Sequence, residues 1–298
     1  YDPTIWSEFA DKTLHRLACG DQGIYDLLEE VIGYLFYRRN ELRKSFILLG
    51  DKANGKSTYL DMLKTLLGDG NTSALDLGEL GERFKTAELF GKLANIGDDI
   101  GDEFIANPAI FKKLVSGDRV NAERKGQDPF DFSSYAKLLF SANSMPRIRD
   151  KTGAVLDRIV LVPFKATFTK EDPDFDPYIK YKLRSPEVMS HLINIGLKGL
   201  ERVLTNRSFT TPEAVEVELE AYAVANNQVL DFFHETPVDE VVNEATSHVY
   251  DVYLGWAVRN NLKPLGQNEF TKQANRYYGI TSATRRIDRK RLRIFVKE

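Results

Sequence analysis

The stretch FILLGDKANGKSTYLDMLKTLLG, Phe46 to Gly68, decides the fold of this chain. Its first apolar segment, Phe46 to Leu49, has the length of a buried strand. Leucines then recur at helical spacing from Ser57 onward, and Gly68 is a typical helix stop. Between strand and helix the residues fit the pattern G-x-x-x-x-G-K-[ST] without a gap. The stretch therefore predicts a phosphate-binding loop.

Such a loop suits a nucleoside triphosphate. Its backbone N–H groups and the positive end of the following helix form a concave set of donors for phosphate oxygens. We expect Lys56 to reach the β and γ phosphates, and Ser57 to bind a Mg²⁺ ion completed by phosphate oxygens and water. The alternative is a glycine-rich turn before a surface helix. The predicted ATP-binding residues are Gly50, Asp51, Lys52, Ala53, Asn54, Gly55, Lys56, Ser57 and Thr58.

Composition narrows the class of protein. The 298 residues exceed the usual size of one hydrophobic core, so we expect two domains. A hydrophobic content of 42% and a charged content of 29% are typical of a folded soluble protein. No apolar run is long enough to span a bilayer, no signal peptide opens the chain, and the single cysteine, Cys19, excludes an internal disulfide. These features predict a cytoplasmic protein. Because the first residue is Tyr1, we expect the chain to be part of a longer polypeptide.

Hydrophobic periodicity divides the chain into three predicted parts. Residues 1–44 are mostly helical, residues 45–205 alternate short apolar runs with helical runs as an α/β core does, and residues 206–298 are helical with a basic β segment at the end. A helix is expected from Ser185 to Thr205, with Ser at its cap. A long amphipathic helix is expected to begin at Pro212, and we place a domain boundary near its middle.

A second strand candidate, KLANIGDDI, ends in acidic residues. Asp98 and Asp99 follow an apolar run, at the edge where ligands bind in open α/β sheets. We assign Asp98 to the Mg²⁺ ion and Asp99 to the attacking water, and the two roles are interchangeable. Asp102 and Glu103 lie close by in sequence and are further candidates. The alternative is that these acids only decorate an exposed loop.

A third strand candidate ends in Asn143. An amide at a strand tip can both accept and donate a hydrogen bond, so Asn143 is a candidate sensor of the γ phosphate. The alternative is a turn residue, which a lone Asn before Met-Pro more often is. Further on, Arg158 precedes the apolar run RIVLVPF and could act as an arginine finger in a neighbouring subunit's site. Its alternative is a surface salt bridge with an acid such as Asp157.

Four motifs stand in one order along the chain: GDKANGKS, NIGDDI, KKLVSGDRVNAERKGQDPFDF, and LLFSANSMP followed by LDRIVLVPF. This set resembles a superfamily 3 helicase, in particular the helicase part of the phage and plasmid primase family related to the poxvirus helicase-primase. The resemblance covers nearly the whole chain, since the Tyr and Trp spacing of VYDVYLGWAVRNNLKPLGQNEF is similar to that family's C-terminal region.

The resemblance implies an AAA+-like P-loop ATPase core with an N-terminal helical oligomerisation or collar region and a C-terminal winged-helix-like domain. It also implies a hexameric ring, ATP and Mg²⁺ at sites between subunits, translocation on single-stranded DNA, forked DNA as a partner, and a primase module upstream. A phage-encoded or mobile-element protein of this kind would act in the host cytoplasm. The carried-over catalytic residues are Lys56, Asp98, Asp99, Asn143 and Arg158. The family usually has a second arginine where Asp157 stands and a glutamate where Asp99 stands, so the finger and the base both stay open.

The segment special to this superfamily has strand-like flanks around Arg124, Lys125, Gly126 and Gln127. A hairpin that projects these cations into a ring's channel would contact phosphates without sequence preference. We expect Lys125 to be the main contact, with Arg124 or Lys113 as helpers. In isolation the same peptide reads as a solvated hairpin turn.

The C-terminal segment resembles a winged helix. A recognition-like helix from Gln267 to Tyr278 precedes the basic run RRIDRKRLR, whose Arg285, Arg286 and Arg289 are candidate DNA contacts. Winged helices also dock proteins, so this role stays open. The net charge of −3 excludes a uniformly basic coat but not such a local stripe.

Three functions compete for this sequence. The leading hypothesis is an ATP-driven replicative DNA helicase. The second is an ATP-dependent origin-binding initiator that oligomerises on DNA without processive unwinding. The third, a small-molecule kinase or GTPase, shares the phosphate loop, but the chain has no Asn-Lys-x-Asp signature and a kinase does not need the hairpin.

Overall fold

The computed structural model of the chain describes residues 2–100, 108–143, 145, 154–173, 175–260, 262–287 and 290–297. The side chains at 99, 100, 221, 223–226, 287 and 290 lie outside that description. The chain forms two compact units, Tyr1–Glu216 and Val217–Glu298. Residues 1–44 and the predicted core therefore fold as parts of one unit.

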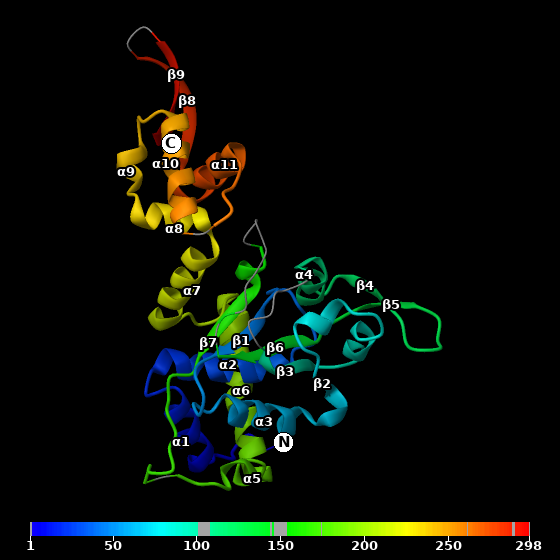
Figure 1. Cartoon of the computed structure of the whole chain (residues 1–298). Coiled ribbons are helices and arrows are strands. Elements are labelled where there is room, and N and C mark those ends of the chain that lie inside the picture. The colour runs from blue at the N-terminus through cyan, green and yellow to red at the C-terminus, as the bar shows by residue number, and fades with distance from the viewer. Residues whose placement is uncertain are drawn as a thin grey trace. The chain divides into compact units, whose positions relative to one another are not determined.

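A five-stranded sheet forms the centre of the first unit (Figure 1). The strands are β1 (Ser45–Leu49), β2 (Thr72–Ser73), β3 (Ala94–Ile100), β6 (Lys137–Ala142) and β7 (Ile159–Pro163). Their order is β2-β3-β6-β1-β7, and every pair is parallel. Strand β1 is nearly all buried between β6 and β7, which explains its continuous apolar run. Because the strands are parallel, their carboxyl ends share one edge of the sheet.

The helices of this unit are α1 (Glu8–Leu17), α2 (Gln22–Phe36), α3 (Lys56–Leu67), α4 (Pro108–Ser116), α5 (Ile179–Lys182) and α6 (Pro186–Asn206). Short 3-10 helices cover Asp69–Asn71, Gly78–Gly81, Thr86–Leu89 and Leu156–Arg158. Helix α6 begins as the sequence predicts, because the Ser185 side chain accepts a hydrogen bond from the Val188 N–H. Helix α3 ends at the predicted stop, Gly68.

Helices α2 and α6 approach each other closely, and glycines make this possible. A Cβ added at Gly33 would overlap the backbone of Gly196, so only glycine fits there. Beside this contact the buried Glu30 carboxylate accepts hydrogen bonds from Arg202 Nε at 2.7 Å and from the Thr210 N–H at 2.7 Å. A buried charge is tolerated only when it is paired in this way. The N-terminal helices are thereby fixed to the rest of the unit.

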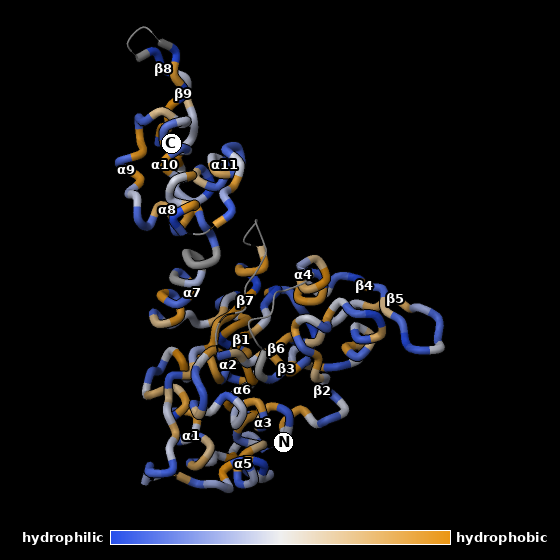
Figure 2. Tube along the Cα trace, viewed as in Figure 1, coloured by the Kyte–Doolittle hydropathy of each residue, from blue (hydrophilic) through white to orange (hydrophobic). Residues whose placement is uncertain are grey.

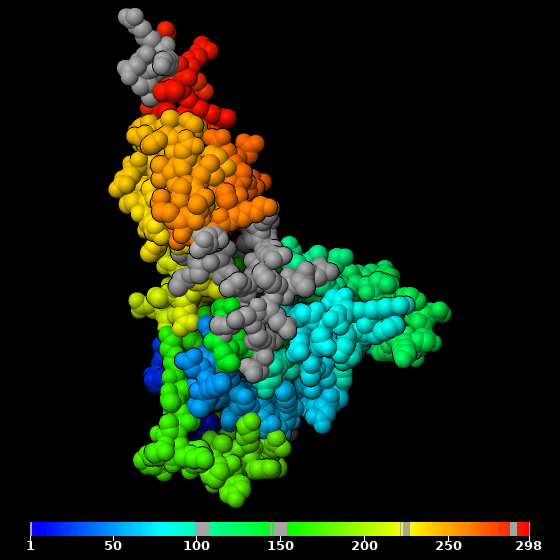
Figure 3. All heavy atoms as spheres, viewed as in Figure 1, coloured from blue at the N-terminus to red at the C-terminus, as the bar shows by residue number. Residues whose placement is uncertain are grey.

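A two-stranded hairpin stands apart from the sheet. It consists of β4 (Arg119–Ala122) and β5 (Phe130–Ser133), paired antiparallel with Arg119 opposite Ser133. Figure 1 shows the hairpin reaching away from the sheet, and Figure 3 shows it as a projection bordered by the cyan residues of the β2–β3 connection. The turn at its far end has mainly hydrophilic colours in Figure 2. The hairpin predicted from the sequence is confirmed.

The second unit has its own core. Its elements are α8 (Gln228–Glu235), α9 (Val238–Val241), α10 (Thr246–Arg259), α11 (Gln267–Tyr278), β8 (Ile280–Ile287) and β9 (Lys290–Lys297), and α7 (Glu213–Asn226) spans the boundary. The core contains the rings of Phe232, Tyr253, Trp256 and Phe270. Helix α11 has the predicted bounds, and β8 pairs with β9 as an antiparallel hairpin. In the described part of the whole chain, no helix combines the length and apolar character required to cross a membrane.

One predicted element is wrong. The long helix expected from Pro212 is two helices, α7 and α8, which are separated at Asn227. The Asn227 side chain accepts hydrogen bonds from the N–H groups of Val229 and Leu230, so it caps a new helix instead of continuing the old one. Periodicity alone did not reveal this stop because the apolar spacing continues across it.

Candidate nucleotide-binding site

The phosphate loop connects β1 to α3, at the carboxyl edge of the sheet. Gly55 is the N-cap of α3 and has a left-handed backbone with φ 90°, which glycine adopts without strain. A Cβ at Gly50 would overlap the Asn54 side chain and the Phe164 carbonyl oxygen. Both glycines of the motif are therefore required by geometry, and the predicted strand–loop–helix context is confirmed.

Asn54 fixes the loop to the neighbouring strand. Its Nδ2 donates to the Phe164 carbonyl oxygen at 2.7 Å, just beyond β7, and its Oδ1 accepts from Lys56 Nζ at 3.1 Å. The amide is buried, so each of these hydrogen bonds satisfies a group that water does not reach. The sequence placed Asn54 in the loop but gave no role to its side chain.

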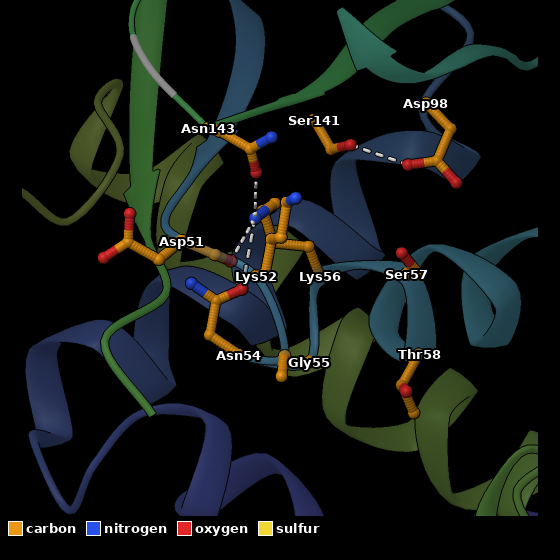
Figure 4. Close-up of a pocket in the computed structure, with 11 residues that line it drawn as sticks. Asp51, Lys52, Asn54, Gly55, Lys56, Ser57, Thr58, Asp98, Ser141 and Asn143 are labelled. Atoms are coloured by element: carbon orange, nitrogen blue, oxygen red, sulfur yellow. Dashed lines mark hydrogen bonds between the residues drawn. The ribbon is translucent and has the colours of Figure 1, made fainter. Parts of the chain in front are cut away.

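Lys56 is buried, and its ammonium group donates to several neutral oxygens. Nζ donates to the carbonyl oxygens of Gly50 and Asp51, the latter at 2.8 Å. It also donates to Oδ1 of Asn143 at 3.3 Å (Figure 4). Carbonyl oxygens compensate a buried cation less well than an anion does. A phosphate in the loop would compete with these carbonyl oxygens for the ammonium group.

Asn143 lies directly after β6, which neighbours β1 in the sheet. The contact with Lys56 Nζ places the predicted sensor beside the predicted phosphate-binding lysine, although 87 residues separate them in sequence. Strand order alone produces this contact, because the carboxyl ends of adjacent parallel strands meet at one edge.

Asp98 is exposed in β3 and lies on the cavity, and its Oδ1 accepts a hydrogen bond from Ser141 Oγ at 2.7 Å. Sequence reasoning missed Ser141. A signal was present, because Ser141 and Asn143 are two residues apart and side chains two apart on a strand point to the same face. Figure 4 shows the Asp98 carboxylate across the cavity from Ser57. The Asp99 side chain, Asp102 and Glu103 lie outside the described residues.

These side chains line one cavity of about 440 Å³. It is lined by Asp51, Lys52, Ala53, Asn54, Gly55, Lys56, Ser57, Thr58, Asp98, Ser141 and Asn143. A carboxylate and a hydroxyl are hard oxygen donors of the kind Mg²⁺ prefers. Within the described part of the chain no group of three or more His, Cys, Asp or Glu residues gathers around a metal position.

A larger apolar cavity of about 770 Å³ adjoins the first and shares Ala53, Gly55 and Thr58 with it. Its walls come from α1 and from the segment between β7 and α5, and include Phe9, Leu17, Phe168, Phe175 and Ile179. The Arg16 guanidinium stacks over the Phe168 ring at 4.7 Å and pairs with Asp172 at 3.1 Å.

Arg158 lies far from the phosphate loop and its cavity. It ends the 3-10 helix before β7, at the amino edge of the sheet, and its Nη1 donates to the Ala154 carbonyl oxygen at 2.6 Å. Since β1 and β7 are parallel, about five residues of strand, roughly 16 Å, separate this edge from the phosphate loop. Arg158 therefore does not reach the nucleotide site of its own chain.

The predicted DNA contacts are surface residues. Lys113 is exposed in α4, and Arg124 and Lys125 are exposed in the turn of the hairpin. The Arg124 guanidinium lies over the rings of Phe130, at 5.2 Å, and Phe90, at 5.7 Å. In the second unit Arg285 and Arg286 are exposed on β8, and Arg289 lies outside the described residues.

Two family models match parts of the chain. Residues 48–158 match the family described as "Family of unknown function (DUF5906)", and residues 225–279 match the family described as "Poxvirus D5 protein-like". The chain is similar to the poxvirus D5-like family, as predicted, and this match falls on the C-terminal stretch with the Tyr and Trp spacing.

Among curated proteins, the relatives include "Putative helicase 184R" of Invertebrate iridescent virus 6, with 26% identity over 156 residues, and "Putative helicase L207/L206" of Acanthamoeba polyphaga mimivirus, with 26% identity over 139 residues. The matches cover 48% and 44% of this chain, but only 16% and 14% of the length of those relatives. The chain thus corresponds to a small part of much longer viral proteins.

Solved structures show the same fold. The apo A form of the NrS-1 C terminal region superposes with a TM-score of 0.63 at 12% identity, covering 98% of this chain and 75% of that one. A second apo structure of that region gives 0.59 at 12% identity, covering 98% and 76%. Identity this low relates the folds alone.

Proposed function

We propose that this chain is the ATP-hydrolysing part of a DNA helicase, built on an AAA+-like core. One observation carries the proposal. Four residues from three separate strand ends line one cavity: Lys56, Ser57, Asp98 and Asn143. These are the residue types that triphosphate cleavage uses. The strand order and the similarity to proteins named as helicases support it.

The roles follow from the geometry. Lys56 would exchange its carbonyl partners for the β and γ phosphates, and Asn143, already beside Lys56 Nζ, would contact the γ phosphate and orient the attacking water. Ser57 and Asp98 would hold Mg²⁺, which when bound stabilises charge on the phosphate oxygens. Ser141 keeps the Asp98 carboxylate turned toward the cavity. Asp99 stays our proposal for the base.

The adjoining apolar cavity fits the nucleoside. It begins at Ala53, Gly55 and Thr58, where the phosphate cavity ends, and aromatic rings from two separate segments line it. A planar base buried there would gain stacking and hydrophobic contacts of the usual kind.

The position of Arg158 favours a ring. Because its edge of the sheet lies roughly 16 Å from its own phosphate loop, it can serve only a nucleotide bound by a neighbouring copy. We therefore propose a homo-oligomer, a hexamer by analogy with the family, in which each site is completed in trans. The hairpin turn with Arg124 and Lys125 would contact single-stranded DNA, and a primase module would precede this chain in the full-length protein.

The test is an unwinding assay on a forked duplex with ATP, with Lys56→Ala as control. ATP-dependent strand separation that this variant lacks is the expected result. Binding that depends on ATP without any separation would favour the origin-binding initiator. ATP consumption that ignores DNA and follows a small acceptor would refute both.

Completion of the site in trans has its own test. Arg158→Ala should abolish hydrolysis and leave nucleotide binding intact. Mixed with Lys56→Ala protein, it should regain part of the activity, because one intact composite site can form between the two kinds of subunit. Absence of rescue at every mixing ratio would exclude a shared site.

A further inference from the structure

A second polar cavity lies at the root of the β4–β5 hairpin. Its volume is about 460 Å³, and we refer to it as the hairpin-root cavity. One wall is the connection from α2 to β1, and the other is the chain that enters and leaves the hairpin. It is lined by Arg38, Arg39, Asn40, Glu41, Arg43, Ser116, Gly117, Ser133, Ser134 and Tyr135.

The two walls are fixed to each other by Asn40. Its Nδ2 donates to the carbonyl oxygens of Ser134 at 3.0 Å and Leu114 at 3.3 Å, on the two sides of the hairpin. Gly117 has a left-handed backbone with φ 73°, and a Cβ there would lie 3.3 Å from Asn40 Cβ. These contacts hold the two walls of the cavity in a fixed arrangement.

The cavity carries excess positive charge. It has three guanidinium groups and one carboxylate, that of Glu41, which pairs with Arg39 at 2.9 Å. The Arg38 guanidinium stacks over the Tyr135 ring at 4.4 Å and donates from Nη2 to its hydroxyl at 2.7 Å, so its fork is held in place. Stacking leaves the other N–H groups of an arginine available to an anion.

Arg43 has two unusual properties. Among the residues that the structure describes, its side chain makes no hydrogen bond or ion pair, and its backbone has φ 51°. A left-handed conformation costs a non-glycine residue free energy, and such strain tends to persist at functional positions. The strain places an unpaired guanidinium at the rim of this cavity.

A further cation lies beneath the connection. Lys137, at the start of β6, is buried, and its Nζ donates to the carbonyl oxygens of Arg39 at 2.7 Å and Tyr135 at 3.1 Å, and to Asn40 Oδ1. Burial lowers the pKa of Lys137 from 10.5 to about 7, against the opposing effect of Glu41. An anion above it would compensate this charge as well.

We propose that the hairpin-root cavity binds a backbone phosphate of a nucleic acid strand that lies along the β4–β5 hairpin. The inference rests on the proposed function and adds a second contact to the one at the hairpin turn. Arginine forks and serine hydroxyls suit phosphate oxygens. The nucleotide of the same chain is excluded as the occupant, because the cavity lies beside the amino ends of β1 and β6 and the phosphate loop beside their carboxyl ends.

The test is the salt dependence of oligo-dT binding, measured by fluorescence anisotropy on the full chain. Arg38→Gln/Arg43→Gln should weaken binding and lower the slope of log K against log salt concentration by about 0.7, the value for one phosphate neutralised on a single strand. Arg43→Gln alone should lower the slope by part of that amount. Since the Arg43 side chain has no described partner to lose, this variant should keep its fold.

The matched control is Lys180→Gln/Lys198→Gln, which removes two exposed charges elsewhere in the same unit and should leave the slope unchanged. An unaltered slope in both arginine variants, with wild-type DNA binding intact, would overturn the inference and leave the proposed function standing. Wild-type protein that binds no DNA would overturn both. Loss of DNA-independent ATP hydrolysis with an unaltered slope would assign the cavity to a neighbouring copy's nucleotide and also overturn the inference.

Discussion

Ser141→Ala gives the sharpest test of the candidate site, because sequence reasoning gave this serine no role. The Ser141 hydroxyl donates to Asp98 Oδ1 at 2.7 Å inside the cavity, and the serine itself is buried. A hydrogen bond to a charged group contributes about 1.5–3 kcal/mol, which corresponds to roughly 10- to 100-fold in an equilibrium constant. Mutation of a residue that hydrogen-bonds a metal ligand typically lowers metal affinity by the same factor, about 10- to 100-fold.

We therefore expect Ser141→Ala to raise the Mg²⁺ concentration for half-maximal ATP hydrolysis by about 10- to 100-fold. The measurement is a Mg²⁺ titration of hydrolysis at saturating ATP. Ser73→Ala is the matched control, because Ser73 Oγ donates to Asn95 Oδ1 at 2.9 Å outside the cavity. If Ser141→Ala titrates like the wild type, Asp98 does not hold the metal ion in the way we argue.

Three further outcomes are expected. Gly33→Ala should lower the free energy of unfolding by about 1–3 kcal/mol or more, because the added Cβ would overlap the α6 backbone. Gly70 has open space around it, so Gly70→Ala should leave the free energy of unfolding unchanged. Equal denaturant midpoints for the two variants would contradict this packing. Lys125→Ala should lower the salt slope of single-stranded DNA binding by about 0.7 and abolish DNA-stimulated hydrolysis, and wild-type unwinding by the variant would remove the turn from the mechanism. The folded chain releases the Lys137 proton near pH 7 and the unfolded chain near 10.5, so this residue should make the free energy of unfolding rise with pH through that window by about 5 kcal/mol at most. Lys137→Met should flatten that rise in denaturant titrations at several pH values, and an unchanged pH dependence would show that the lysine titrates normally.

The sequence alone determined the local elements that chemistry constrains most tightly. The phosphate loop was predictable because Gly50, Gly55 and Lys56 have backbone and charge requirements that few other patterns meet. The strands β3, β6 and β7, the hairpin, and helices α6 and α11 were predictable because each has a clear period or cap. The break at Asn227 was not, since a capping asparagine inside a continuing apolar pattern resembles an ordinary helical residue.

Only the tertiary structure decided which residues meet. Strand order places Asn143 against Lys56, and no local pattern encodes the order of strands in a sheet. The same holds for Asn54 bonding the chain beyond β7, and for Arg38 and Arg43 closing over the root of a hairpin more than 70 residues further along the chain. Sequence spacing reports contacts within one helix or strand, whereas contacts between elements depend on how their buried faces pack, which is a property of the whole core.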